Sequence, residues 1–227
     1  MSLNMEKTNL SIGRYSATIF SPAVAKTCPV VYTHFPAAEA EAVASLQGDP
    51  KFVLISVDGV DWDCDLSPWP APRVFNNRND FAGRADAYLK ELTEKIVPAV
   101  EAKLGFSPCC RSIAGYSLAG LFAVYALYRT DIFSRVASMS SALWYDGFLN
   151  FMKTNRPIRL PERAYFSLGD RESKSKNPRL ATVETCTAEA ENLLRSLGVN
   201  TILELNPGNH FMDVPERIAK GIRWITI

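Results

Sequence analysis

Two residues of this chain, Ser117 and His210, have the type and surroundings that nucleophilic catalysis needs. Ser117 lies in the segment IAGYSLAG (residues 113–120), after an apolar run that favours a strand and before one that favours a helix. A sharp strand-to-helix turn exposes a serine hydroxyl, but it needs small residues two positions before and after the serine. Gly115 and Ala119 occupy these positions, so the pattern is GxSxA rather than GxSxG. We therefore predict Ser117 as a nucleophile.

A serine hydroxyl needs a base that titrates near neutral pH, and the usual one is histidine. The chain has only two histidines, His34 and His210. His210 follows the last expected strand and comes after the serine, in agreement with the chain order nucleophile, acid, histidine. His34 comes before the serine, so we expect a structural role for it, with a substrate contact left open. His210 is the predicted general base.

Two carboxylates, Asp170 and Glu172, compete for the acid that orients the histidine and stabilises the imidazolium. Both follow an expected strand over residues 164–168. In many α/β folds with a serine nucleophile, the acid comes three residues after a glycine that ends a strand. Gly169 is such a glycine here, and this spacing favours Glu172. The other carboxylate is then a solvated loop residue.

Two backbone N–H groups should face the negative charge that develops during ester cleavage. Leu118, directly after the serine, supplies one. The other should come from the loop after an expected strand over residues 29–34. Pro36 has no N–H, so we predict Phe35, with Ala37 as the alternative.

Aromatic residues are frequent in the loops expected at the carboxyl ends of the strands, where ligands bind in open α/β sheets. Trp69 and Trp144 are the predicted substrate contacts, and Trp62 and Tyr145 belong to the same set. An aromatic or extended apolar acyl group would fit them, although ordinary loop packing explains them equally well. Residues 153–179 contain eight basic and three acidic residues, which we interpret as a solvated surface rather than a site for an anionic ester.

The elements that position these residues alternate between apolar β-branched runs and segments of helical period. This alternation predicts an α/β fold, a mostly parallel central sheet flanked by helices on both faces, in a single domain over residues 1–227. We expect strands over residues 29–34, 51–57, 111–115, 136–139, 164–168 and 201–205. The expected helices cover residues 83–104, 118–128, 147–153, 178–197 and 214–225. Pro98 should kink or end the first helix, and residues 61–73 should form a long surface loop.

Composition excludes several classes of function. The formal net charge is only +1, which disfavours nucleic acid and anionic membranes as partners. No apolar run is long enough to span a membrane, and the N-terminus does not resemble a secretory signal, so we expect a cytoplasmic protein. The five cysteines lack zinc-like or redox-like spacing, and we interpret them as reduced thiols. We expect no metal and no cofactor, because the two histidines form no ligand cluster.

The chain resembles the putative-esterase branch of the α/β-hydrolases, which includes feruloyl esterases, S-formylglutathione hydrolases, enterochelin-type esterases and mycolyltransferases. The resemblance covers most of the chain from about residue 28. It implies an α/β-hydrolase fold, a triad of Ser117, Glu172 and His210, oxyanion donors at Leu118 and near Phe35, and a cleft wall at Trp144. Two departures are Ala119 in place of glycine and His-Phe-Pro (34–36), where relatives often carry Asp-Gly. The segments that carry the resemblance are residues 81–86, 95–98, 115–120, 138–144, 169–172 and 208–211.

We therefore expect a serine esterase that hydrolyses a small carboxylic ester through an acyl-serine intermediate. An acyltransferase with the same triad is one alternative, and a non-catalytic module that kept the fold and binds a ligand is another. The sequence identifies neither the physiological ester nor the oligomeric state, and a homo-oligomer stays open.

Overall fold

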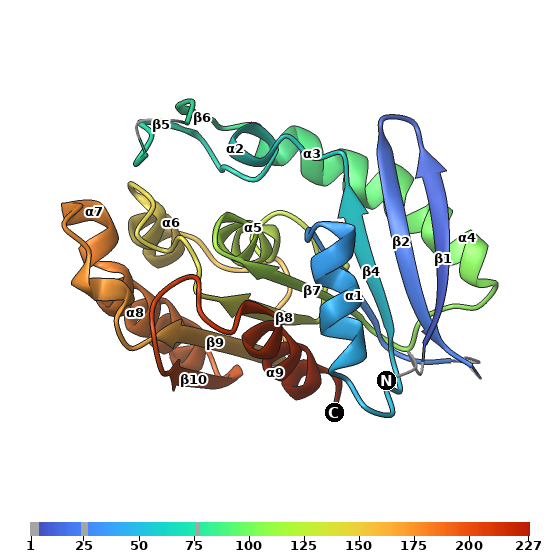
Figure 1. The fold of residues 1–227 in the computed structure, drawn as a ribbon. Helices are drawn as coiled ribbons and strands as arrows, with labels where there is room; N and C mark the ends of the chain where they lie inside the picture. Colours follow the sequence, from blue (N-terminus) through green and yellow to red (C-terminus); the bar gives the residue numbers. More distant parts are fainter. Residues whose placement is uncertain (1–4, 24–26, 76–77) are drawn as a thin grey trace.

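A computed structural model describes residues 5–23, 27–75 and 78–227, and its centre is an eight-stranded sheet (Figure 1). The strand order is β1-β2-β4-β3-β7-β8-β9-β10. The six strands from β4 to β10 are parallel, and the β1–β2 hairpin joins them antiparallel to β4. The strands are β1 (Met5–Ile12), β2 (Tyr15–Pro22), β3 (Val30–Thr33), β4 (Val53–Asp58), β7 (Arg111–Tyr116), β8 (Arg135–Met139), β9 (Arg163–Gly169) and β10 (Asn200–Asn206).

Helices cover both faces of the sheet, so apolar side chains are buried on both sides of it (Figure 1). One face packs against α1 (Ala37–Ser45) and α9 (Val214–Thr226). The other face packs against α3 (Ala85–Glu91), a π-helical segment (Leu92–Ile96), α4 (Val97–Leu104), α5 (Leu118–Ala126), α6 (Phe148–Thr154) and α8 (Val183–Ser196). The α/β architecture predicted from the sequence is confirmed.

Short elements form the loops at one end of the molecule. They are α2 (Trp62–Asp65), the small β5–β6 ladder (Pro70–Ala71 with Phe81–Ala82), a 3₁₀ turn (Glu172–Lys174) and α7 (Pro178–Ala181). The prediction of a long surface loop over residues 61–73 was therefore wrong in part, because α2 and β5 lie within it. The helix expected over residues 178–197 is divided at Thr182 into α7 and α8.

Pro98 does not end its helix, which continues from α3 through a π-helical turn into α4. A proline ring clashes with the carbonyl four residues earlier and removes one helical hydrogen bond. The structure accommodates it with the π-helical turn Leu92–Ile96, after which Pro98 lies in the first turn of α4. Gly105 ends α4 in a left-handed conformation (φ 73°), and its N–H donates to the Glu101 carbonyl at 3.1 Å.

The β1–β2 hairpin and α1 were not predicted. β1 is an edge strand whose residues are mostly exposed, so it lacks the apolar run that identifies the central strands. Among the helices that the structure describes, none combines the length and apolarity needed to cross a membrane.

Candidate active site

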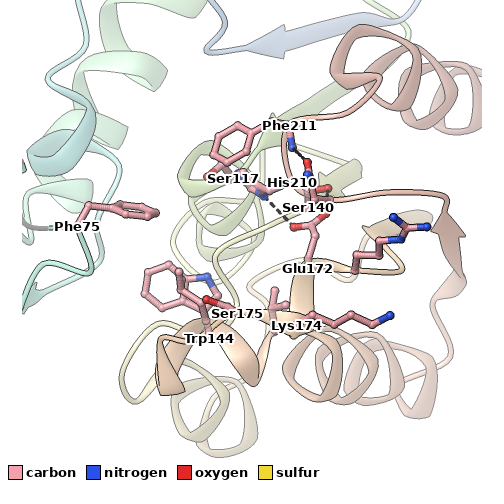
Figure 2. A pocket seen from close by; sticks show the side chains of 13 residues that line it. Phe75, Ser117, Ser140, Trp144, Glu172, Lys174, Ser175, His210 and Phe211 are labelled. Atoms are coloured by element: carbon pink, nitrogen blue, oxygen red, sulfur yellow. Dashed lines mark hydrogen bonds and ion pairs between the residues drawn. The ribbon is translucent and has the colours of Figure 1, made fainter.

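Ser117, Glu172 and His210 lie at the carboxyl end of the parallel sheet (Figure 2). Ser117 directly follows β7, Glu172 comes three residues after β9, and His210 comes four residues after β10. Adjacent parallel strands deliver their carboxyl ends to one edge, where open α/β sheets bind their ligands. The topology thus brings together three residues that are 38 or more positions apart in the sequence.

The backbone at Ser117 has the strained geometry of a nucleophile turn. Its φ of 57° and ψ of −124° are rare for a residue other than glycine. The Ser117 N–H donates to the Met139 carbonyl at 3.1 Å, which ties the turn to β8. A Cβ at Gly115 would collide with the backbone carbonyl of Ala119, so this position requires glycine. Ala119 is fully buried, and its methyl group is accommodated.

His210 is paired with Glu172. Its Nδ1 lies 2.8 Å from Oε2 of Glu172, and the carboxylate is only 4 % exposed. The other oxygen, Oε1, accepts hydrogen bonds from the Ser140 hydroxyl and the Gly169 N–H, both at 2.7 Å. Because Oε1 is occupied in this way, Oε2 remains to orient the imidazole.

The environment of Glu172 favours its ionised form. Burial by itself raises the pKa of the carboxyl. The hydrogen bonds from His210 and Ser140, the charge of His210 and the Gly169 N–H together outweigh burial, so the pKa is lower than usual. A carboxylate held in this state can stabilise an imidazolium beside it.

Asp170 makes a different contact. Its Oδ1 accepts the Gly208 N–H at 2.8 Å, and its side chain is half exposed. It therefore fixes the loop that carries His210 without touching the imidazole. Of the two carboxylates that the sequence offered, the structure brings Glu172 to the histidine.

A cleft opens over Ser117 and His210 and consists of two pockets, each of about 320 Å³, which both residues line. Trp144, Phe75 and Phe211 line both pockets and face the cleft from different loops (Figure 2). Phe75 and Phe211 are 50 % and 80 % exposed, so apolar surface is available to a ligand. A volume of this size suits a small organic molecule.

The two pockets differ in their polar lining. The first is also lined by Arg171 and Lys174. The second is also lined by Asp63, Arg73 and Arg78, and Asp63 lies 4.0 Å from Arg78. Part of the basic segment 153–179 therefore reaches the cleft. Arg179, from the same segment, packs against Trp144 with its guanidinium 5.2 Å from the centre of the ring.

Two of the four predicted substrate and oxyanion residues line the cleft. Trp144 and Leu118 line the cleft, and Leu118 begins α5, where the first N–H groups lack intrahelical acceptors. Trp69 and Phe35 are not among the described residues that line either pocket. Trp69 packs against Tyr145, Phe148 and other rings, and Phe35 is buried with its carbonyl accepting from Ser56.

His34 directly follows β3 and is buried. Its Nε2 lies 2.8 Å from the Tyr88 hydroxyl, and its ring also packs edge-on against Phe122. Burial lowers its pKa to about 3, so the ring is neutral at physiological pH. It lines neither pocket among the described residues, in agreement with the expected structural role.

Sequence reasoning missed three side chains around the site. Phe75 and Phe211 line the cleft, and Arg217 lies against Glu172 with its Nη1 3.3 Å from Oε1. Phe211 had a signal, because it directly follows the predicted base. No sequence signal marks Arg217, which is an arginine on the buried face of an amphipathic helix. No three His, Cys, Asp or Glu side chains of the described residues are grouped to hold a metal.

Comparison with known proteins places the chain in a family. A family model described as "Putative esterase" matches residues 26–197, which is more than half of the chain and ends before His210. The uncharacterized protein YbbA of Bacillus subtilis is 26 % identical over 139 residues, which are 60 % of this chain and 56 % of that protein. The match therefore spans little more than half the length of this relative.

Solved structures share the fold. An IroE-like serine hydrolase from Shewanella oneidensis superposes with a TM-score of 0.80 at 16 % identity, covering 98 % of this chain and 80 % of that one. The siderophore hydrolase EstA from Aspergillus nidulans gives 0.73 at 19 % identity, with 99 % and 95 % coverage. A ferulic acid esterase gives 0.67 at 13 % identity, with 98 % and 97 % coverage. The chain belongs to the putative esterase family of enzymes and has the α/β-hydrolase fold.

Proposed function

We propose that this protein is a serine esterase that cleaves small carboxylic esters through an acyl-Ser117 intermediate. The observation that carries the proposal is the 2.8 Å contact between His210 Nδ1 and the buried Glu172 carboxylate, beside a cleft that Ser117 and His210 both line. Family membership and the fold support the class of reaction.

The proposed reaction has two stages, acylation of Ser117 and hydrolysis of the acyl-enzyme. His210 Nε2 takes the Ser117 proton as Oγ attacks the ester carbonyl carbon, and the Leu118 N–H faces the resulting oxyanion. Collapse of the tetrahedral intermediate breaks the bond to the alcohol oxygen, which takes the proton from His210. Water then attacks the acyl-enzyme with His210 as base, and the carboxylic acid and free Ser117 are released.

The lining of the cleft favours a substrate with an aromatic or extended apolar group. Phe75, Trp144 and Phe211 offer ring faces on different sides of the reacting centre. The names of the structural neighbours, siderophore hydrolases and a ferulic acid esterase, support testing aromatic acyl esters first. Arg171 and Lys174 at one pocket would accept a negatively charged substituent.

The test is reaction with a fluorophosphonate probe, followed by mass spectrometry of the adduct. We expect labelling at Ser117 of the wild-type protein and none in Ser117→Ala or His210→Ala. Labelling of a different serine, or none in a folded wild-type protein, would reject the proposal. Product analysis with an added acceptor alcohol then separates hydrolysis, which gives only the free acid, from acyl transfer.

A further inference from the structure

A buried arginine lies behind the Glu172–His210 pair. Arg217 of α9 is 1 % exposed, and it is not among the described residues that line the cleft. A guanidinium loses its hydration when it is buried, so it is stable there only with matched partners. The partners of Arg217 show what it does.

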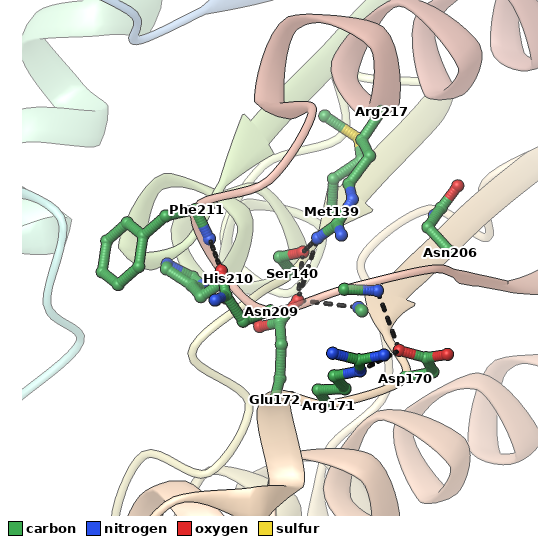
Figure 3. Close-up of polar contacts among 12 residues, drawn as sticks. Met139, Ser140, Asp170, Arg171, Glu172, Asn206, Asn209, His210, Phe211 and Arg217 are labelled. Carbon is green, nitrogen blue, oxygen red and sulfur yellow. Dashed lines mark hydrogen bonds and ion pairs between the residues drawn. The ribbon is translucent and has the colours of Figure 1, made fainter.

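Its contacts reach the loops that carry all three proposed catalytic residues. Arg217 Nη1 lies 3.3 Å from Glu172 Oε1 and 3.5 Å from the Ser140 hydroxyl (Figure 3). Nη2 donates to the Pro207 carbonyl at 2.8 Å, at the start of the loop that leads to His210.

A further contact leads through a tyrosine to the nucleophile turn. Arg217 Nη1 lies 3.3 Å from the hydroxyl of Tyr116, the residue before Ser117. That hydroxyl donates to the backbone carbonyl of His210 at 2.8 Å. Arg217 thus contacts all of these loops from one position, in addition to the Asp170–Gly208 hydrogen bond that joins two of them.

The charge of Arg217 has a second effect. Glu172 has Arg217 on Oε1 and His210 on Oε2, so the arginine balances the buried carboxylate while the imidazole is neutral. Without Arg217, the carboxylate would have only a protonated imidazole to balance it. A protonated imidazole cannot accept the Ser117 proton.

We propose that Arg217 is a positioning residue of the active site. It holds Glu172 so that Oε2 faces His210, and its positive charge balances the buried carboxylate. This inference rests on the proposed function and adds a residue to it that does not touch the substrate.

Other ionisable groups around the pair do not replace this charge. Asp170 is bound to the Gly208 N–H, and Arg171 lies 4.0 Å from Asp170 on the exposed side of the loop. Lys220, one turn further along α9, is paired with Glu204 at 2.6 Å. Burial raises the pKa of Tyr116, so this residue is neutral at physiological pH.

The experiment measures the rate constant for fluorophosphonate labelling of Ser117 between pH 5 and pH 10, in proteins shown to be folded by near-ultraviolet circular dichroism. Arg217→Met should label at least about tenfold more slowly at pH 7. The pH of half-maximal labelling should rise by about one unit, since a nearby positive charge is gone. Arg217→Lys keeps the charge and should keep this pH within about 0.3 units.

Two further variants make the result specific. Arg223→Met removes an exposed arginine of the same helix, whose guanidinium donates to the Leu46 carbonyl, and should label like the wild type. In a Glu172→Gln background, Arg217→Met should slow labelling less than it does alone, because the two residues act through one interaction. This double variant also removes both buried charges, so it is expected to fold even where the single variant does not.

Each outcome can be assigned. A wild-type protein that is not labelled refutes the proposed function itself. A labelled wild type together with a folded Arg217→Met of unchanged rate and pH midpoint refutes only the role of Arg217. If Arg217→Met does not fold, a shift of one pH unit or more in the labelling midpoint of folded Arg217→Lys overturns the proposal. The proposal is also overturned if Arg217→Met slows labelling in the Glu172→Gln background by the full factor expected for it alone.

Discussion

The carboxylates Asp170 and Glu172 are two positions apart, yet the structure gives them separate tasks. Glu172 is buried against the imidazole, whereas Asp170 binds a backbone N–H of the histidine loop. The spacing in the sequence favoured Glu172 as the acid but did not exclude Asp170. Either carboxylate could reach the histidine as long as the conformation of the loop was unknown. The hydrogen bonds to Ser140 and Gly169 that fix Glu172 exist only in the folded protein.

Substitution of each carboxylate tests this division. Glu172→Gln keeps the shape but removes the charge that stabilises the imidazolium, so kcat/KM should fall by roughly 10³- to 10⁴-fold. Asp170→Asn should cost less than about tenfold, because it only weakens one loop hydrogen bond. Steady-state kinetics on one chromogenic ester decide between them. A larger loss in Asp170→Asn would make Asp170 the acid.

The two predicted substrate tryptophans can be separated in the same way. Trp144→Ala removes a cleft wall, so the preference for an aromatic acyl ester over an acetyl ester should fall by about tenfold or more. Trp69→Phe is the matched control, since this ring packs outside the cleft, and the preference should stay unchanged. The ratio of kcat/KM values for the two esters is the measurement. An unchanged ratio in Trp144→Ala would remove this residue from acyl selection.

At the scale of elements, the central strands could be predicted and the hairpin could not. β3, β7 and β8 are buried along almost their whole length, so most of their residues are apolar or small. β1 has a mostly exposed, polar sequence at the sheet edge, and only its two-residue connection Gly13–Arg14 to β2 is typical of a hairpin. Arg217 escaped prediction because its partners come from four separate segments of the chain.

The turn from β7 to α5 requires glycine at position 115 but accommodates alanine at position 119. Gly115→Ala should lower the free energy of unfolding by about 1–3 kcal/mol and slow labelling of Ser117, because its methyl group meets the Ala119 backbone. Ala119→Gly should keep the labelling rate and cost only about 1 kcal/mol from helix propensity. Urea unfolding and probe kinetics measure both effects. If Gly115→Ala behaves like the wild type, the turn does not have the close approach described.

For the whole molecule, His34 connects stability to pH. Burial lowers its pKa from the ordinary value of 6.5 to about 3, so the unfolded chain binds a proton in this range that the folded protein does not. Stability contributed by the neutral ring is therefore complete above pH 6.5 and is lost as the pH falls toward 3. Between pH 6.5 and pH 5 the wild type should lose roughly 2 kcal/mol from this group.

His34→Gln removes this group while keeping a polar side chain near Tyr88. The difference in unfolding free energy between pH 6.5 and pH 5, measured by urea denaturation, should be smaller in the variant by that amount. Glu172 does not affect this difference, because its lowered pKa changes stability only as the pH falls below about 4.5. Equal pH dependence of wild type and His34→Gln would show that His34 is not buried as a neutral ring.

The position of Arg217 on α9 has a consequence for how the protein is made. A ribosome releases the chain from its N-terminus, so β7, β9 and β10 emerge before the helix that carries the counter-charge of Glu172. A nascent chain that has the serine, the carboxylate and the histidine but not yet α9 would leave that carboxylate unbalanced. If Arg217 has the proposed role, esterase activity begins only when α9 docks.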